Sequence, residues 1–128
     1  MSKALYGSTF LSLFFLAFLH WYALEHHLYF FYPSLDIFMH LFGGFTVGLC
    51  AVMVISFFFK NLQLRVACAL VFLSVLASGA LWEVFELYLN FEFNLENFSL
   101  QDTVADLVND LVGGMVAFYI AYKKQWYV

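Results

Sequence analysis

Charged residues are scarce in this sequence. Asp, Glu, Lys and Arg make up 11% of the 128 residues, whereas 65% of the residues are hydrophobic and 23% are aromatic. Soluble domains carry about 25% charged residues, so this composition excludes an ordinary soluble domain. With five basic residues against nine acidic ones, the sequence also predicts no nucleic-acid partner.

Cysteine is nearly absent as well. Cys50 and Cys68 are the only two, and there is no C-x-x-C pair, which excludes a thiolate metal site. The two cysteines lie on neighbouring apolar runs. Counted at about 1.5 Å per residue from Lys60 and Arg65, they fall at different depths, so we expect no disulfide.

Four long apolar runs take up most of the chain. They cover residues 5–24, 36–59, 66–89 and 102–122, and each is near the roughly 20 residues that a helix needs to cross a bilayer. Lys3 precedes the first run, as in a signal peptide, but no small-x-small cleavage site follows it. The sequence therefore predicts an all-α integral membrane bundle of four transmembrane helices, forming one domain over residues 1–128.

The basic residues indicate how these helices are oriented. All of them fall before the first run, between the second and third, or after the fourth: Lys3, Lys60, Arg65, Lys123 and Lys124. By the positive-inside rule, both termini are predicted to be cytoplasmic. The acids instead fall in the outer connections or in the outer half of a helix, which places a candidate site near the outer surface.

Polar residues line one face of three of the predicted helices. Residues three or four apart share a helix face. In each run the acids or His lie in the outer third and glycine lies toward the middle: Asp36, His40 and Gly44; Glu83, Glu86 and Gly79; Asp102, Asp106, Asp110 and Gly114. We expect the glycines to pack closely at mid-membrane while the outer ends enclose a polar cavity. His20 either faces this cavity or lies at the membrane interface.

No Lys or Arg inside the four runs compensates these acids. A carboxylate at the centre of a membrane helix costs about 2.5–3.5 kcal/mol, which a bound cation, shared protons or water could offset. Asp36 and Asp102 lie near helix N-termini, where the positive end of the helix dipole stabilises their negative charge. Ser34 and Ser99 are the expected N-caps of these two helices. The two glutamates of the third run lie near a negative helix end.

The candidate ligands are rich in oxygen, with one histidine and no cysteine. Such a set is suited to a divalent metal, namely Mg²⁺, Mn²⁺, Ca²⁺ or Zn²⁺. The predicted metal ligands are Asp36, His40, Glu86, Asp102, Asp106 and Asp110, and the predicted catalytic residues are Glu83, Glu86 and Asp106. The alternative is that these side chains only hold the helices together through hydrogen bonds.

Three sequence blocks, LDIFMHLFGGF, LWEVFEL and DTVADLVNDLVGG, resemble the signature blocks of the YjdF-like family of small bacterial inner-membrane proteins. These signatures read D-x3-H followed by glycine, W-E-x2-E, and D-T-x2-D followed by glycine. The resemblance spans residues 35–114 and implies a multi-pass protein of the bacterial cytoplasmic membrane, without an established reaction. A weaker similarity to VanZ-like proteins, associated with glycopeptide resistance, rests on Asp106 and Gly113, with Asp110 in place of their Asn.

Two classes of function fit these observations. In the first, an outer-leaflet enzyme uses the metal to activate water or a hydroxyl, with Glu83 as base, against an ester or phosphoester of a lipid-linked envelope substrate. In the second, a carrier or sensor binds and releases cations or protons. A third interpretation is an accessory protein with a structural polar stripe. Membrane lipid is the expected partner, the oligomeric state is left open, and the 90–101 connection is either an interfacial loop or a lid.

Overall fold

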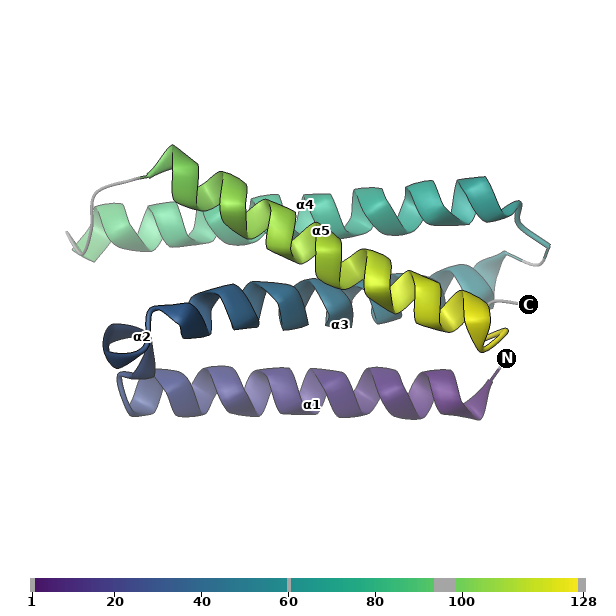
Figure 1. Cartoon of the computed structure of the whole chain (residues 1–128), viewed down its shortest axis with the longest axis horizontal. Helices are drawn as coiled ribbons and strands as arrows, with labels where there is room; N and C mark the ends of the chain where they lie inside the picture. Colours follow the sequence, from purple (N-terminus) through teal and green to yellow (C-terminus); the bar gives the residue numbers. More distant parts are fainter. Residues whose placement is uncertain (1, 60, 94–98, 127–128) are drawn as a thin grey trace.

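The computed structural model of the protein describes residues 2–59, 61–93 and 99–126. Within these ranges lie four long helices and one short helix: α1 (Lys3–Glu25), α2 (Leu28–Phe31), α3 (Ser34–Phe58), α4 (Leu64–Phe93) and α5 (Leu100–Lys123) (Figure 1). Each long helix is long and apolar enough to cross a membrane. The predicted all-α bundle of four membrane-spanning helices is therefore confirmed.

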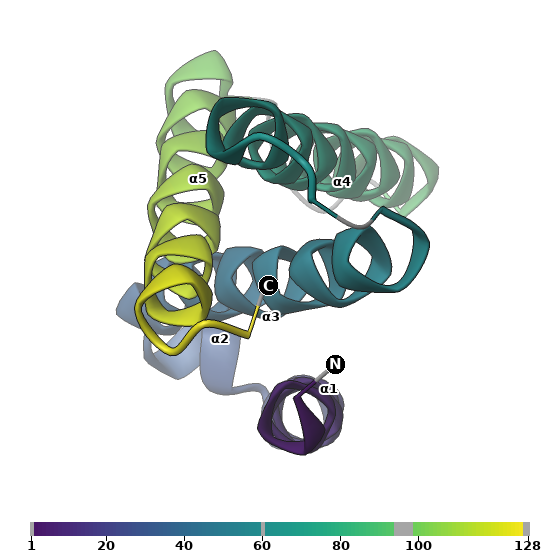
Figure 2. The same ribbon diagram turned by 90° about the vertical axis from the view of Figure 1, so that its right-hand side faces the viewer.

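The long helices run side by side, and α5 crosses the others obliquely (Figure 1). Seen from the end, α3, α4 and α5 pack around one another, while α1 lies outside them against α3 (Figure 2). The basic residues at the start of α1, the start of α4 and the end of α5 share one end of the bundle. Which side of the membrane this end faces stays a prediction.

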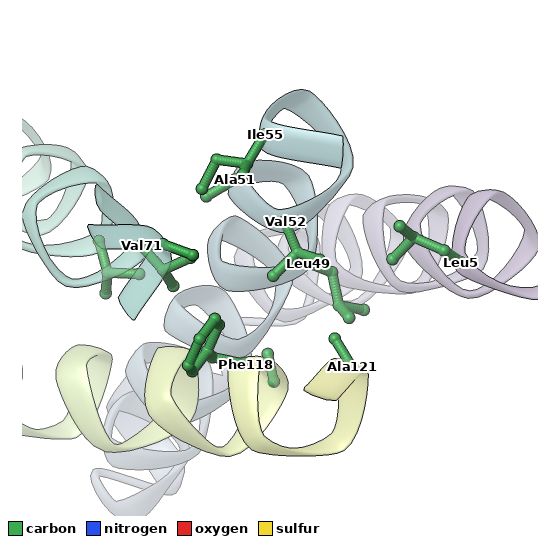
Figure 3. Close-up of a cluster of buried hydrophobic side chains, with 11 residues drawn as sticks. Leu5, Leu49, Ala51, Val52, Ile55, Val71, Phe118 and Ala121 are labelled. Atoms are coloured by element: carbon green, nitrogen blue, oxygen red, sulfur yellow. The ribbon is translucent and has the colours of Figure 1, made fainter. Parts of the chain in front are cut away.

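An apolar core fills the half of the bundle next to the chain termini. All four long helices contribute to it, with Leu5 from α1, Leu49 and Val52 from α3, Val71 from α4 and Phe118 from α5 (Figure 3). In a bilayer, helices associate mainly through van der Waals packing of this kind. The core leaves the other half of the bundle for the polar residues.

Glycine brings α3 and α5 into backbone contact. A Cβ atom at Gly44 would overlap the backbone carbonyl of Asp110, and a Cβ atom at Gly113 would overlap the carbonyl oxygen of Leu41. Because the obstructing atoms belong to the backbone, neither position has room for a side chain. The predicted close packing at Gly44 is confirmed. This packing places the face of α5 that carries Asp106 and Asp110 against α3.

All but one of the ends of the long helices lie within two residues of the expected ones, and one expected N-cap is different. α4 continues to Phe93, which adds one turn beyond the predicted end at residue 89. Ser34 is not the N-cap of α3 as predicted, because Pro33 occupies that position with a helical backbone, φ −56°. Ser99 does cap α5, since its side chain accepts a hydrogen bond from the backbone N–H of Asp102. Residues 94–98, the centre of the proposed lid, lie outside the described residues.

Candidate metal centre

His40 is the centre of a polar cluster in the half of the bundle away from the chain termini. It lies on α3 and is only 5% exposed. Its Nε2 atom lies 3.9 Å from a carboxylate oxygen on each of three helices: Asp36 of α3, Glu83 of α4 and Asp106 of α5. The structure therefore brings together the three polar stripes of the sequence.

Asp110 contacts the opposite edge of the same imidazole ring. Its Oδ2 atom forms a hydrogen bond of 3.4 Å with Nδ1 of His40. Asp106 and Asp110 are one turn apart on α5, so the helix presents one carboxylate to each ring nitrogen. Asp110 belongs to neither group of converging ligand atoms found in the part of the chain that the structure describes.

The cluster is buried on one side and partly open on the other. Asp106 and Asp110 are 4% and 6% exposed, whereas the side chain of Asp36 is 37% exposed. The Oε1 atom of Glu83 is buried and has no hydrogen-bond partner within the described ranges. An unpaired buried oxygen is costly, so this atom is a natural point of contact for a cation or a water molecule.

Glu86 joins the cluster from α4. His40, Glu83 and Glu86 each offer one potential ligand atom, and these three atoms lie within 4.8 Å of one another. The indole N–H of Trp82 donates a hydrogen bond of 2.7 Å to Oε1 of Glu86 and so orients its carboxylate. Trp82 is not among the site residues predicted from the sequence, although its four-residue spacing from Glu86 could have indicated this contact.

The structure does not bring Asp102 into the cluster. Asp102 lies in the first turn of α5, is exposed, and has its backbone N–H bonded to the Ser99 hydroxyl at 3.3 Å. It belongs to neither group of converging ligand atoms found within the described ranges. Helical spacing alone suggested Asp102 as a ligand, but Asp102 lies a full turn beyond Asp106, toward the N-terminal end of α5.

The remaining residues fit a divalent cation. The groups of converging ligand atoms are Asp36, His40 and Asp106, and His40, Glu83 and Glu86, each within 4.8 Å. A Ca²⁺ ion holds oxygen ligands at about 2.3–2.6 Å, so two ligands on opposite sides lie about 5 Å apart. Carboxylate oxygens with one imidazole nitrogen suit the hard and borderline divalent metals.

A hydrogen bond between α1 and α2 lies at the edge of this cluster. The Tyr29 hydroxyl is 2.8 Å from Nδ1 of His20, and the His20 ring packs edge-on against Trp82 at 5.5 Å. His27, just before α2, has a left-handed backbone with φ 53°, which turns the chain between α1 and α2. The sequence left the place of His20 open and missed Tyr29, because no helical spacing connects them.

Tyr29 lies close enough to the acids to be affected by their charge. Burial, followed by the nearby carboxylates of Asp36 and Glu86, raises the pKa of Tyr29 to about 12. Its hydroxyl therefore keeps its proton at neutral pH and can donate a hydrogen bond to His20.

The chain matches the family described as predicted membrane protein, DUF2238, over residues 2–125. This match agrees with the resemblance of its motifs to the YjdF-like family, whereas the similarity to VanZ-like proteins stays a prediction. No curated protein and no solved structure matches the chain.

Proposed function

We propose that this chain, which belongs to the DUF2238 family of predicted membrane proteins, binds a divalent cation in its polar cluster and acts on a lipid-linked envelope substrate. The side chains that would hold the cation are Asp36, His40 and Asp106, whose ligand atoms converge, together with Glu86, whose ligand atom converges with those of His40 and Glu83 in a second group. Mg²⁺, Mn²⁺, Ca²⁺ and Zn²⁺ are the candidates.

The proposal rests on buried negative charge. Four carboxylates lie within 4.0 Å of the His40 ring nitrogens, at 3.9, 3.9, 3.9 and 3.4 Å. One imidazolium would offset one of these charges at most. The described basic residues are far away, since Arg65 and Glu83 are separated by about 27 Å along α4 at 1.5 Å per residue. A divalent cation would supply the missing positive charge.

The same arrangement suits hydrolysis or transfer of an ester or phosphoester. A bound cation would polarise a substrate oxygen or make a bound water molecule more acidic. Glu83 would act as the base, because its buried Oε1 atom has no hydrogen-bond partner within the described ranges and faces His40. The partly exposed Asp36 marks the edge at which a lipid headgroup would reach the cluster.

A carrier or sensor function receives less support. Cations or protons crossing the membrane would need polar groups in the other half of the bundle. That half is filled by the apolar core, where Leu49, Val52, Val71 and Val75 are at most 1% exposed. One half of the bundle is polar and the other half is apolar. A site that opens only toward the outer leaflet explains this division more simply than a path across the membrane does.

Metal content and metal-dependent stability test the proposal. Wild-type protein, stripped with chelator and refilled with each candidate metal, should retain one of them and unfold at a higher temperature. Saturation at 100 times Kd stabilises by about 2.7 kcal/mol. Asp106→Asn should remove both effects, whereas Asp102→Asn, at an exposed position outside the cluster, should retain them. If no metal binds or stabilises the wild type, the proposal is wrong.

The substrate requires a separate experiment. Lipids extracted from cells with the protein, without it, and with only the Asp106→Asn variant should be compared by mass spectrometry. An enzyme predicts that one envelope lipid accumulates in both deficient strains. Identical lipid profiles in all three strains would contradict the enzymatic part of the proposal while leaving cation binding intact.

A further inference from the structure

We propose that Asp110 is a positioning residue for His40 and not a metal ligand, and that it thereby sets which cation the site prefers. This inference rests on the proposed cation site. Asp110 would hold the proton on Nδ1 of His40, so that Nε2 presents its lone pair to a cation held among the converging carboxylates. The cation would then receive one nitrogen ligand among oxygen ligands.

The geometry separates the two sides of the ring. Nδ1 of His40 is 3.4 Å from Oδ2 of Asp110. Nε2 lies 3.9 Å from carboxylates of Asp36, Glu83 and Asp106. A neutral imidazole carries its proton on only one nitrogen, and a carboxylate at Nδ1 favours that nitrogen. Histidines that bind metals commonly donate their second ring N–H to a carboxylate in this way.

Three helices fix the position of Asp110. Its backbone on α5 is in contact with Gly44 of α3, where no Cβ would fit. On α4, a Cβ at Gly79 would lie only 2.5 Å from Oδ2 of Asp110 and 3.0 Å from Leu107. The carboxylate therefore occupies space that Gly79 leaves free, and Asp110 is just 6% exposed. Such close packing limits its freedom to swing round to the Nε2 side.

The preference among cations follows from the type of ligand atom. Oxygen ligands alone suit Mg²⁺ and Ca²⁺, whereas an imidazole nitrogen improves the fit for Zn²⁺. If Asp110 keeps Nε2 unprotonated, the site should prefer Zn²⁺ to Mg²⁺. An Asn at position 110 could instead donate to Nδ1, which would move the ring proton to Nε2 and point an N–H at the cation.

The first measurement reads the tautomer without any metal. NMR of the imidazole nitrogens in His-labelled protein, with His40→Gln used for assignment, should be recorded over a pH series that reaches the neutral ring. Wild type should carry the proton on Nδ1, and Asp110→Asn should shift it toward Nε2. Asp110→Glu should restore the wild-type pattern at least in part. A wild-type proton on Nε2, or no change in Asp110→Asn, would overturn the proposal.

The second measurement compares affinities for Zn²⁺ and Mg²⁺. Removing a partner of a ligating histidine typically lowers metal affinity about 10–100-fold, so Asp110→Asn should lose that much for Zn²⁺ and clearly less for Mg²⁺. Gly79→Ala, which crowds Asp110, should have the same direction of effect. Gly7→Ala is the matched control, because no atom lies within 4 Å of its added Cβ.

The outcomes distinguish this inference from the proposed function. Equal losses of Zn²⁺ and Mg²⁺ affinity in Asp110→Asn would make Asp110 a direct ligand and overturn the inference. If the wild type binds neither metal, the cation site itself is wrong, and the NMR measurement still decides whether Asp110 controls the tautomer of His40.

Discussion

The contact between Gly113 of α5 and the backbone of α3 gives the sharpest structural prediction, because it connects helix packing to the polar cluster. In Gly113→Ala, the new Cβ would overlap the carbonyl oxygen of Leu41 and lie 2.8 Å from the backbone N of Phe45. Normal contact begins at 3.4 Å. The contact with Phe45 alone would require the backbones to move apart by about 0.6 Å, and the closer overlap with the Leu41 carbonyl oxygen requires more.

The energetic consequence combines two opposing effects. Overpacking typically costs about 1–3 kcal/mol, and a backbone obstruction falls at the upper end. Replacing Gly by Ala inside a helix returns about 1 kcal/mol of helix propensity. We expect Gly113→Ala to be destabilised by about 1–2 kcal/mol. The same substitution at Gly7, where nothing lies within 4 Å of the added Cβ, should be neutral or stabilising by up to about 1 kcal/mol.

Both variants can be measured in detergent by the temperature at which helical signal and monodispersity are lost. Separation of α3 from α5 should also lengthen the 3.4 Å contact between His40 and Asp110. Gly113→Ala should therefore bind the candidate metal more weakly, whereas Gly7→Ala should not. Equal unfolding temperatures and equal metal affinities for the two variants would refute the close backbone contact.

Two further predictions concern topology and pH. In a protein without Cys50 and Cys68, cysteine introduced at Ser34 should react with an impermeant thiol reagent in intact cells, whereas cysteine introduced at Asn61 should react only after lysis. The reason is that these two exposed positions lie at opposite ends of the bundle. The reverse labelling pattern would mean that the predicted orientation is wrong. The pKa of Tyr29 is raised to about 12 in the folded protein, above the usual value of about 10. Its contribution to stability is therefore complete below about pH 10 and lost as the pH rises to about 12, so Tyr29→Phe should flatten the alkaline loss of stability. Identical alkaline profiles in wild type and variant would show that Tyr29 does not contribute.

The membrane-spanning helices followed from the sequence because length and hydropathy act locally. A run of about 20 apolar residues has to be a helix in lipid, since no water is available for its backbone groups. The polar stripes could also be predicted from the sequence, because helical spacing is a local property that fixes which side chains share a face. Asp36 with His40, and Asp106 with Asp110, could therefore be paired from their four-residue spacing.

Spacing within a helix says nothing about how that helix is rotated or shifted against its neighbours. The sequence predicted close packing at Gly44, but only the tertiary structure decided that Gly44 meets Asp110 and that Gly113 meets Leu41, and these contacts set the offset between the polar stripes of α3 and α5. The offset leaves Asp102 one turn outside the cluster and puts Asp110 against Nδ1 of His40. The sequence predicted one undivided set of ligands, whereas backbone contact between helices divides it into residues that face Nε2 and one that faces Nδ1.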